Sequence, residues 1–192
     1  MKKSHFFAYV SRMRFIQRWA LMRNTASENV QEHSHQVAVL AHALAVIRNK
    51  KFDGNIDAGQ VAVAALYHDA SEILTGDMPT PIKYYNPDIR QAYKEVEAVA
   101  EKKLLDMLPV ELQGVYELVI TGMSGEVEVL VKAADKLSAY IKCVEELKAG
   151  NHEFREAAAQ TRKALESYDL PEVRYFMETF MDSFSLTLDE LK

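Results

Sequence analysis

The sequence predicts one all-α domain, and three observations support that prediction. Apolar residues recur at the spacing of an amphipathic helix in one segment after another. No segment alternates apolar and polar residues over the length that a β-strand needs. The 192 residues include 7 Gly and 5 Pro, too few for the frequent turns of a β-sandwich or β-barrel. A chain of this length can bury a sizeable core without disulfide bonds.

Composition and charge exclude several classes of protein. Apolar residues make up 48% and charged residues 27% of the chain, which is typical of soluble globular proteins. The net charge of −5 and the pI near 5.7 argue against a general binder of nucleic acid polymers. The single cysteine, Cys143, rules out an internal disulfide and a cysteine-rich zinc module. Residues 61–67 form the longest apolar run, which is too short to span a membrane, and we see no secretory signal, so we expect a cytoplasmic protein.

The first two predicted helices flank a polar turn. Apolar side chains follow a helical period over residues 4–19, which predicts the first helix. Asn29 is suited to cap the second helix, because Glu32 follows three residues later in a loose capping box. An apolar stripe continues from this cap and predicts that the second helix runs to about residue 49.

The third predicted helix begins after Asp57, a suitable cap, and runs to about residue 74. Because residues 61–67 are apolar almost all round, we predict that this helix is buried at the centre of the fold. The prolines of residues 75–81 then predict a loop, since proline lacks a backbone donor and restricts the residue before it. Helical patterns resume in five further segments: 88–107, 109–121, 127–149, 153–168 and 171–184.

Residue types that bind metals cluster at the end of the third predicted helix. An apolar run there leads into His68, Asp69 and Glu72, and burying such groups together is costly unless they are paired or bind a metal. His33 lies in the first turn of the second helix, and Asp135 is embedded in a later amphipathic helix. Three packed helices would bring these histidines and aspartates to one point. That donor set suits Mn, Co, Fe, Ni or Zn, whereas the alternative is a paired structural histidine with solvent-facing acids.

The ordered His, His-Asp doublet and distant Asp resemble the metal signature of the HD-domain phosphohydrolase superfamily. Further motifs, spread over almost the whole chain, are similar to those of the bacterial HD-domain 5′-deoxynucleotidases of the YfbR type. The stretch 67–81 is the most specific part of this resemblance. The motifs are Ser4-His5-Phe6-Phe7, Arg18-Trp19, Leu21-Met22-Arg23-Asn24, Glu28-Asn29-Val30, Glu32-His33-Ser34, Tyr67-His68-Asp69-Ala70-Ser71-Glu72, Leu74-Thr75-Gly76-Asp77, Pro79-Thr80-Pro81 and Phe176-Met177-Glu178.

The resemblance implies a metal-dependent phosphoric monoester hydrolase. Its substrates would be deoxyribonucleoside 5′-monophosphates, with several bases accepted and ribonucleotides disfavoured. The implied cofactor is one divalent transition metal, foremost Co²⁺, with Mn²⁺ or Cu²⁺ as alternatives, and the implied assembly is a homodimer. The implied fold is a single HD-domain helical bundle over residues 1–192, with a metal-binding core at about 28–142 and C-terminal helices at 150–186 packed on it.

The resemblance also assigns roles to individual residues. Several of these keep an alternative: Arg18 can instead form a surface salt bridge, and Trp19 can be a core anchor rather than a shape filter at the sugar C2′. Asp77 could accept from the sugar 3′-hydroxyl, protonate the leaving 5′-oxygen, or stabilise a turn. The implied metal ligands are His33, His68, Asp69 and Asp135, the implied catalytic carboxylate is Glu72, and the implied substrate residues are Arg18, Trp19, Asp77 and Thr80.

Two other functions remain open at this point. One stays within the superfamily, as a phosphodiesterase or a nucleoside triphosphate hydrolase. The other is a non-catalytic helical binding module with a degenerate site. The presence of every implied metal ligand and of Glu72 argues against degeneracy.

Overall fold

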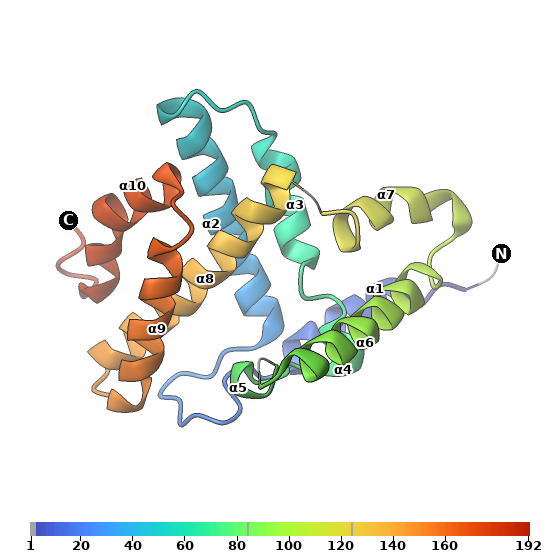
Figure 1. The fold of residues 1–192 in the computed structure, drawn as a ribbon, viewed down its shortest axis with the longest axis horizontal. Helices are drawn as coiled ribbons and strands as arrows, with labels where there is room; N and C mark the ends of the chain where they lie inside the picture. The colour runs from blue at the N-terminus through green and yellow to red at the C-terminus, as the bar shows by residue number, and fades with distance from the viewer. Residues whose placement is uncertain (1–2, 84, 124) are drawn as a thin grey trace.

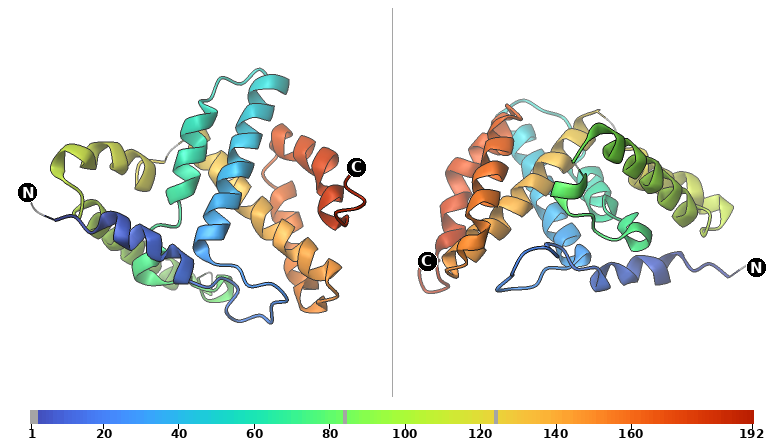
Figure 2. Two further views of the ribbon diagram at one scale, coloured as in Figure 1. Left: turned by 180° about the vertical axis from the view of Figure 1, so that it is seen from behind. Right: turned by 60° about the horizontal axis from the view of Figure 1, so that its bottom comes forward.

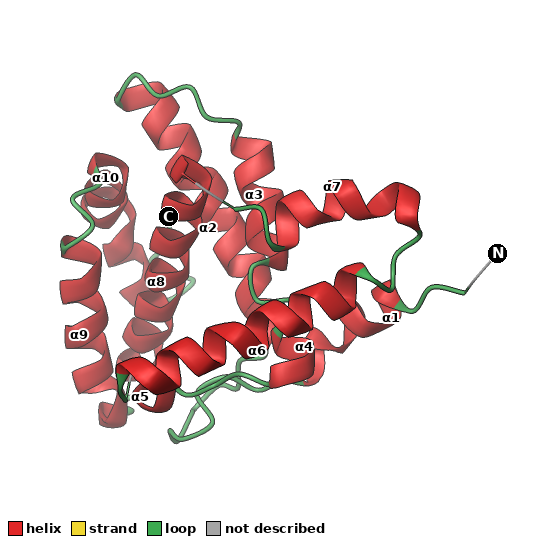
Figure 3. Cartoon of the chain, turned by 45° about the vertical axis from the view of Figure 1, so that its right-hand side comes forward, coloured by secondary structure: helices red, strands yellow, loops and turns green. Residues whose placement is uncertain are grey.

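The computed structural model describes residues 3–83, 85–123 and 125–192, and helices joined by loops make up this part of the chain (Figures 1 and 3). No β-strand is found among these residues, and an isolated antiparallel bridge joins Gln17 to Asn29. The prediction of an all-α protein is therefore confirmed. No helix in the described ranges is long and apolar enough to cross a membrane. In chain order the elements are α1 (Phe6–Val10), the 3-10 helix η1 (Ser11–Phe15), α2 (Val30–Lys51), α3 (Ala58–Tyr67), α4 (Glu72–Thr75), α5 (Thr80–Lys83), α6 (Pro87–Leu105), α7 (Val110–Ile120), α8 (Gly125–Lys148), the 3-10 helix η2 (His152–Phe154), α9 (Arg155–Glu166), α10 (Pro171–Phe180) and the 3-10 helix η3 (Met181–Ser185).

Helix α2 begins where the capping residues predict. The Asn29 side chain accepts a hydrogen bond from the Glu32 backbone N–H at 3.0 Å, and the Asn29 N–H donates to the Glu32 carboxylate at 3.3 Å. From this cap α2 runs through the middle of the molecule and packs against α3 and α8 (Figures 1 and 2). The main core lies between these three helices and includes Val37, Ala41, Leu44, Val61, Ala65, Leu130, Ala134, Leu137 and Ile141. This core fixes the start of α2 and the end of α3 relative to the middle of α8.

The C-terminal helices pack on this centre. Helix α9 lies along α8, and α10 lies against α2, where Val173 and Phe176 join the main core (Figure 2). The observed helices α6 to α10 match the predicted segments, with ends shifted by a few residues and with 3-10 turns before α9 and after α10. The division into a core at about 28–142 and added helices at 150–186 stays a prediction.

A second apolar cluster fixes the turn that follows α3. Phe6 of α1 packs there with Leu104 and Ile120 from the end of α6 and the end of α7. Ala70, in the turn between α3 and α4, belongs to the same cluster and has no exposed surface. The turn is therefore anchored on the side opposite the main core.

The helix predicted over residues 4–19 is wrong in its last part. Helices α1 and η1 end at Phe15, and the chain continues in an extended conformation. The Arg18 backbone N–H then donates to the Glu28 carbonyl at 2.9 Å, which pairs this segment with the residues just before α2. Helical periodicity in the sequence does not report such pairing with a distant segment. As a result, Arg18 and Trp19 lie on a loop beside the start of α2.

The helix predicted to run from Asp57 to about residue 74 is interrupted. Helix α3 ends at Tyr67, a turn follows, and α4 begins at Glu72. Neither glycine nor proline marks this break in the sequence. The long-range contact that accompanies the break is the burial of Ala70 in the second cluster, where its side chain has no exposed surface.

The prediction that the third helix is buried at the centre of the fold holds for one side of the helix only. Val61 and Ala65 are fully buried, but Val63 and Leu66 are 43% and 42% exposed. Helix α3 is therefore buried on one side only, and its other side exposes apolar side chains, as many soluble proteins do.

Candidate metal centre and active site

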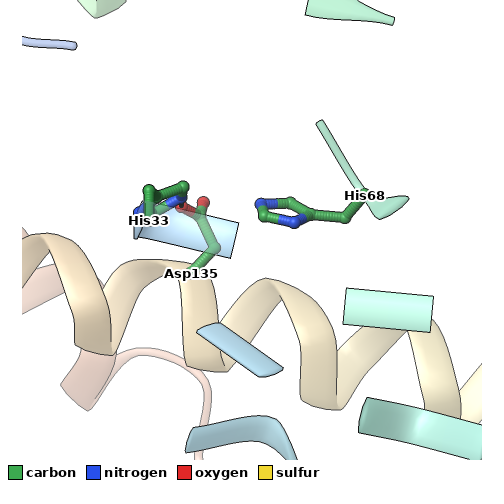
Figure 4. A group of neighbouring side chains, drawn as sticks. All are labelled: His33, His68 and Asp135. Carbon is green, nitrogen blue, oxygen red and sulfur yellow. Dashed lines mark ion pairs between the residues drawn. The ribbon is translucent and has the colours of Figure 1, made fainter. Parts of the chain in front are cut away.

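Three separate elements bring His33, His68 and Asp135 together. His33 lies in the first turn of α2, His68 follows the last residue of α3, and Asp135 lies near the middle of α8. One ligand atom from each residue lies within 4.8 Å of the other two. Figure 4 shows the His68 ring extending toward His33 and Asp135. His33 Nε2 is 3.2 Å from Asp135 Oδ1.

Asp69 reaches the same point because the chain turns after α3. Its Oδ2 atom lies 3.1 Å from His68 Nε2 and 3.5 Å from His33 Nε2. On an unbroken helix the side chains of neighbouring residues diverge by about 100°. In the turn after α3, the Asp69 carboxylate nevertheless lies in direct contact with the His68 imidazole. The four residues predicted as ligands thus form one cluster.

The hydrogen bonds of the two imidazoles leave their Nε2 atoms available. His68 Nδ1 lies 2.7 Å from the Ala65 carbonyl, which can only accept, so the proton is assigned to Nδ1. His33 Nδ1 lies 3.3 Å from Glu28 Oε1 and 3.2 Å from Ser138 Oγ. In the described part of the chain, the Nε2 atoms of both histidines are buried without a hydrogen-bond partner. These orphaned nitrogens beside two carboxylates fit a first-row divalent cation.

The electrostatics of the cluster also favour a cation. Burial opposes ionisation of Asp69, but the neighbouring His68 and His33 lower the pKa of its carboxyl. Burial opposes ionisation of Asp135 as well, and the close contact with the His33 imidazole holds the pKa of Asp135 well below the ordinary value. Burial disfavours the charged form of His33, yet its contacts with carboxylates raise its pKa. Two ionised acids thus face the point where the imidazoles meet.

Arg18 reaches this cluster from the N-terminal loop. Its Nη1 atom donates to Asp69 Oδ2 at 3.4 Å, and its side chain is 13% exposed. Burial opposes the charged form, but Asp69 and Asp135 outweigh it and raise the pKa of Arg18. The guanidinium therefore stays charged, and its ion pairs join it to the cluster rather than to the outer surface.

Trp19, the next residue, is held in an unusual backbone conformation. Its φ is +59°, in the left-handed region that bulky residues rarely adopt. The indole Nε1–H donates to Glu28 Oε2 at 2.7 Å, and the ring packs against Phe154 with centroids 5.3 Å apart. The side chain is only partly buried, so it is anchored on one side and accessible on the other.

Glu72 and Asp77 lie within electrostatic reach of the cluster. Glu72 begins α4 directly after the turn and is 7% exposed. Burial, together with the carboxylates of Asp69 and Asp77, raises the pKa of Glu72 to about 9. Burial also raises the pKa of Asp77. Gly76 precedes Asp77 with φ +74°, a conformation that favours glycine, and Thr80 begins α5 with an exposed side chain.

Two residues of this site were missed by the sequence analysis as site residues. Glu28 contacts the His33 imidazole and the Trp19 indole, and its side chain is 12% exposed. Ser138 donates to Gln36 Oε1 at 2.6 Å, so its oxygen can accept from His33 Nδ1. The available signals were positional: Glu28 immediately precedes the cap of α2, and Ser138 lies one helical turn after Asp135, on the same face of α8.

Comparison with known proteins identifies the family. The sequence profile described as "5′-deoxynucleotidase YfbR-like" matches residues 5–184. The chain belongs to this YfbR-like family. A 5′-deoxynucleotidase of Photobacterium profundum is 55% identical over 193 residues, covering 100% of both chains. One from Vibrio vulnificus is 56% identical over 193 residues, again covering 100% of both. The YfbR-type resemblance carried by the motifs is thus confirmed.

Solved structures share the fold of this YfbR-like chain. An HD-domain phosphohydrolase from Listeria innocua superposes with a TM-score of 0.82 and 22% identity, over 94% of this chain and 88% of that one. The HD phosphohydrolase of cyanophage S-2L, solved with dA and one catalytic Zn²⁺ ion, gives a TM-score of 0.63 and 21% identity over 92% of this chain and 96% of that one. The predicted HD-domain helical fold is therefore confirmed.

Proposed function

We propose that this YfbR-like 5′-deoxynucleotidase binds one divalent transition-metal ion through His33, His68, Asp69 and Asp135. The proposal rests on the Nε2 atoms of His33 and His68, which are buried and lack hydrogen-bond partners within the described ranges. Both atoms face ionised carboxylates, those of Asp135 and Asp69. The family resemblance favours Co²⁺, with Mn²⁺ or Cu²⁺ as alternatives, and the mixed nitrogen and oxygen ligands are compatible with these ions. When bound, the ion supplies a Lewis acid that stabilises charge on a phosphoryl oxygen.

The proposed substrates are deoxyribonucleoside 5′-monophosphates, which are hydrolysed to deoxynucleosides and phosphate with several bases accepted. Phosphoryl transfer depends mainly on positioning and on stabilising negative charge. Arg18 serves both needs, because its planar guanidinium can hold two phosphate oxygens at once. Its contact with Asp69 Oδ2 keeps the guanidinium beside the proposed ligands.

Asp77 and Thr80 are proposed to contact the substrate from the segment after α4. Asp77 accepts from the sugar 3′-hydroxyl or gives a proton to the leaving 5′-oxygen. Burial raises the pKa of Asp77, which favours a carboxyl that can hold a proton. Thr80 is exposed and carries a hydroxyl that can donate to the substrate.

Glu72 is the proposed proton acceptor for the attacking water. Burial and the charges of Asp69 and Asp77 hold the pKa of Glu72 at about 9. Without a bound cation, the Glu72 carboxyl is therefore neutral at pH 7. A metal ion held by the proposed ligands would offset the repulsion from the Asp69 and Asp77 carboxylates and so lower the pKa of Glu72. The ionised form needed for a general base is then present in the loaded site, close to the proposed phosphate position.

Phosphate release from matched substrates across a panel of divalent ions tests the function. After treatment with a chelator, the chain is expected to lose activity, and Co²⁺, Mn²⁺ or Cu²⁺ should restore hydrolysis of deoxynucleoside monophosphates. Ribonucleoside monophosphates and deoxynucleoside triphosphates serve as the comparison substrates. Metal binding without phosphate release from any deoxynucleotide would favour a binding module, and preferred triphosphate turnover would favour another phosphohydrolase.

Sugar selectivity is proposed to come from Trp19. A bulky indole beside the sugar C2′ excludes a 2′-hydroxyl by shape. Trp19→Ala is expected to weaken deoxynucleotide turnover and to lower the dAMP-to-AMP ratio of kcat/KM by roughly tenfold. Phe15→Ala, at an aromatic residue that is 61% exposed nearby in the sequence, is the matched control and should leave the ratio unchanged. Steady-state kinetics on both nucleotides measure the effect, and an unchanged ratio in Trp19→Ala would refute the role.

We also propose that the protein is cytoplasmic and assembles as a homodimer, as the family resemblance implies. Fractionation of cells that express the chain decides the first proposal. The second is decided by the mass of the purified chain in solution.

A further inference from the structure

Glu28 joins three residues of the site. Its Oε2 atom accepts a hydrogen bond from the Trp19 indole at 2.7 Å and lies 3.8 Å from Arg18 Nε, while its Oε1 atom lies 3.3 Å from His33 Nδ1. Building on the proposed function, we propose that Glu28 is a positioning residue that sets sugar selectivity by holding the Trp19 indole in place. One carboxylate thereby links the loop that carries Arg18 and Trp19 to the first turn of α2.

The backbone of Trp19 is strained and needs several contacts to hold it. Its carbonyl accepts from the Met22 N–H at 2.9 Å and from the Asn24 side chain at 3.3 Å. These bonds fix the main chain but not the direction of the ring. The ring direction depends on Phe154, whose ring packs against the indole at an interplanar angle of 54°, and on Glu28, which accepts from the indole N–H. Glu28 is thus the polar contact that orients the indole.

Glu28 is itself held firmly. Its carbonyl accepts from the Arg18 backbone N–H at 2.9 Å, and its side chain is 12% exposed. A fixed carboxylate oxygen 2.7 Å from the indole nitrogen restricts the directions that the Trp19 ring can take.

The loss of Glu28 affects Trp19 more than His33. His33 Nδ1 has a second neighbour, Ser138 Oγ, at 3.2 Å, so the imidazole keeps an acceptor. The described residues supply no second acceptor for the indole N–H. The ring would then tilt. Exclusion of a 2′-hydroxyl by shape depends on a ring edge that is fixed to within about half an ångström. A tilted ring should therefore raise kcat/KM for ribonucleotides more than it lowers kcat/KM for deoxynucleotides.

Kinetics and fluorescence of Glu28 variants test this inference. At saturating metal, Glu28→Ala is expected to lower the dAMP-to-AMP ratio of kcat/KM roughly tenfold, mainly through faster AMP turnover. The emission of Trp19, the single tryptophan of the sequence, is expected to shift to longer wavelength. Glu28→Gln keeps one acceptor oxygen and should recover part of both effects. Glu111→Gln, at an exposed position of α7, is the control.

A double-mutant cycle separates positioning from any other role of Glu28. Trp19→Phe keeps an aromatic ring but removes the N–H, so in that background Glu28→Gln is expected to leave the ratio unchanged. The proposal would be overturned if Glu28→Gln lowered the dAMP-to-AMP ratio equally in the wild-type and Trp19→Phe backgrounds. It would also be overturned if Glu28→Ala shifted the Trp19 emission but left the ratio unchanged. If Glu28→Ala does not fold, the cycle with Glu28→Gln still decides.

The failure of the proposed function has a different signature. The wild-type chain would then release no phosphate from deoxynucleotides with any ion of the panel. The Trp19 emission of the Glu28 variants still tests the contact in that case, because this readout needs no turnover. An emission maximum that does not move in Glu28→Ala would overturn the positioning role by itself.

Discussion

Glu72→Gln is expected to lower kcat by about a hundredfold to ten-thousandfold, the usual contribution of a general base. The carboxyl is neutral at pH 7 without a cation, because its pKa is about 9, and glutamine has nearly the same shape without charge. The variant should therefore fold normally, and its binding of metal and nucleotide should fall far less than its turnover. Glu72→Ala should lose turnover by orders of magnitude as well. Steady-state kcat and equilibrium titration with a deoxynucleotide measure the two properties separately.

The control for this experiment is Glu111→Gln, an exposed carboxylate on α7 that should keep full activity. Turnover of Glu72→Gln within a few-fold of the wild type would remove Glu72 from the reaction. Asp77, the other acid near the cluster whose pKa is raised, would then be the candidate proton acceptor. Loss of metal binding together with loss of turnover would instead show that Glu72 supports the ligands.

Local chemistry made part of this fold predictable. The cap of α2 depends on Asn29 and Glu32, three residues apart, and the structure shows both of its hydrogen bonds. Asp57 likewise accepts from the Gln60 N–H at 3.1 Å at the start of α3. Such signals lie within one helical turn and need no knowledge of the rest of the chain. The later helices followed from apolar spacing for the same reason.

Long-range contacts made the rest unpredictable. The first helix stops at Phe15, where the next segment pairs with residues before α2, and α3 stops before His68, where the chain turns and Ala70 is buried in a separate cluster. Both breaks lie in the candidate site. After the break at the end of α3, Asp69 contacts His68, and in the loop after the first helix the Trp19 indole donates to Glu28, a contact that no local pattern revealed.

The same loop is hydrogen-bonded to a buried ion pair within α8, and breaking this pair is expected to cost the most stability. Glu146 is 1% exposed, pairs with Lys142 one turn earlier, and accepts from the Thr25 N–H at 2.9 Å and the Asn151 side chain at 2.8 Å. Lys142 is 6% exposed. Glu146→Ala leaves that ammonium buried without its carboxylate, so the free energy of unfolding should fall by about 3–5 kcal/mol. Urea denaturation measures the loss.

The matched control is Glu166→Ala on α9. Glu166 pairs with Arg162 at the same spacing, but both side chains are more than half exposed, at 65% and 62%. Solvent screens this pair, so its loss should cost only about 0–1 kcal/mol. Equal losses from the two variants would show that burial of the Lys142 pair contributes nothing to stability.

The contribution of Glu146 is also expected to depend on pH. Burial opposes ionisation, but hydrogen bonds from Lys142, Asn151 and Thr25 outweigh it and hold the pKa of Glu146 below the ordinary 4.5. A carboxyl with a depressed pKa in the folded state stabilises the fold above its unfolded value, and this stabilisation is lost as the pH falls. The difference in unfolding free energy between wild type and Glu146→Ala should therefore narrow steadily below pH 4.5. Because Thr25 lies on the loop that carries Trp19, the Trp19 emission of the folded variant should shift as well, which would link this ion pair to the geometry of the site.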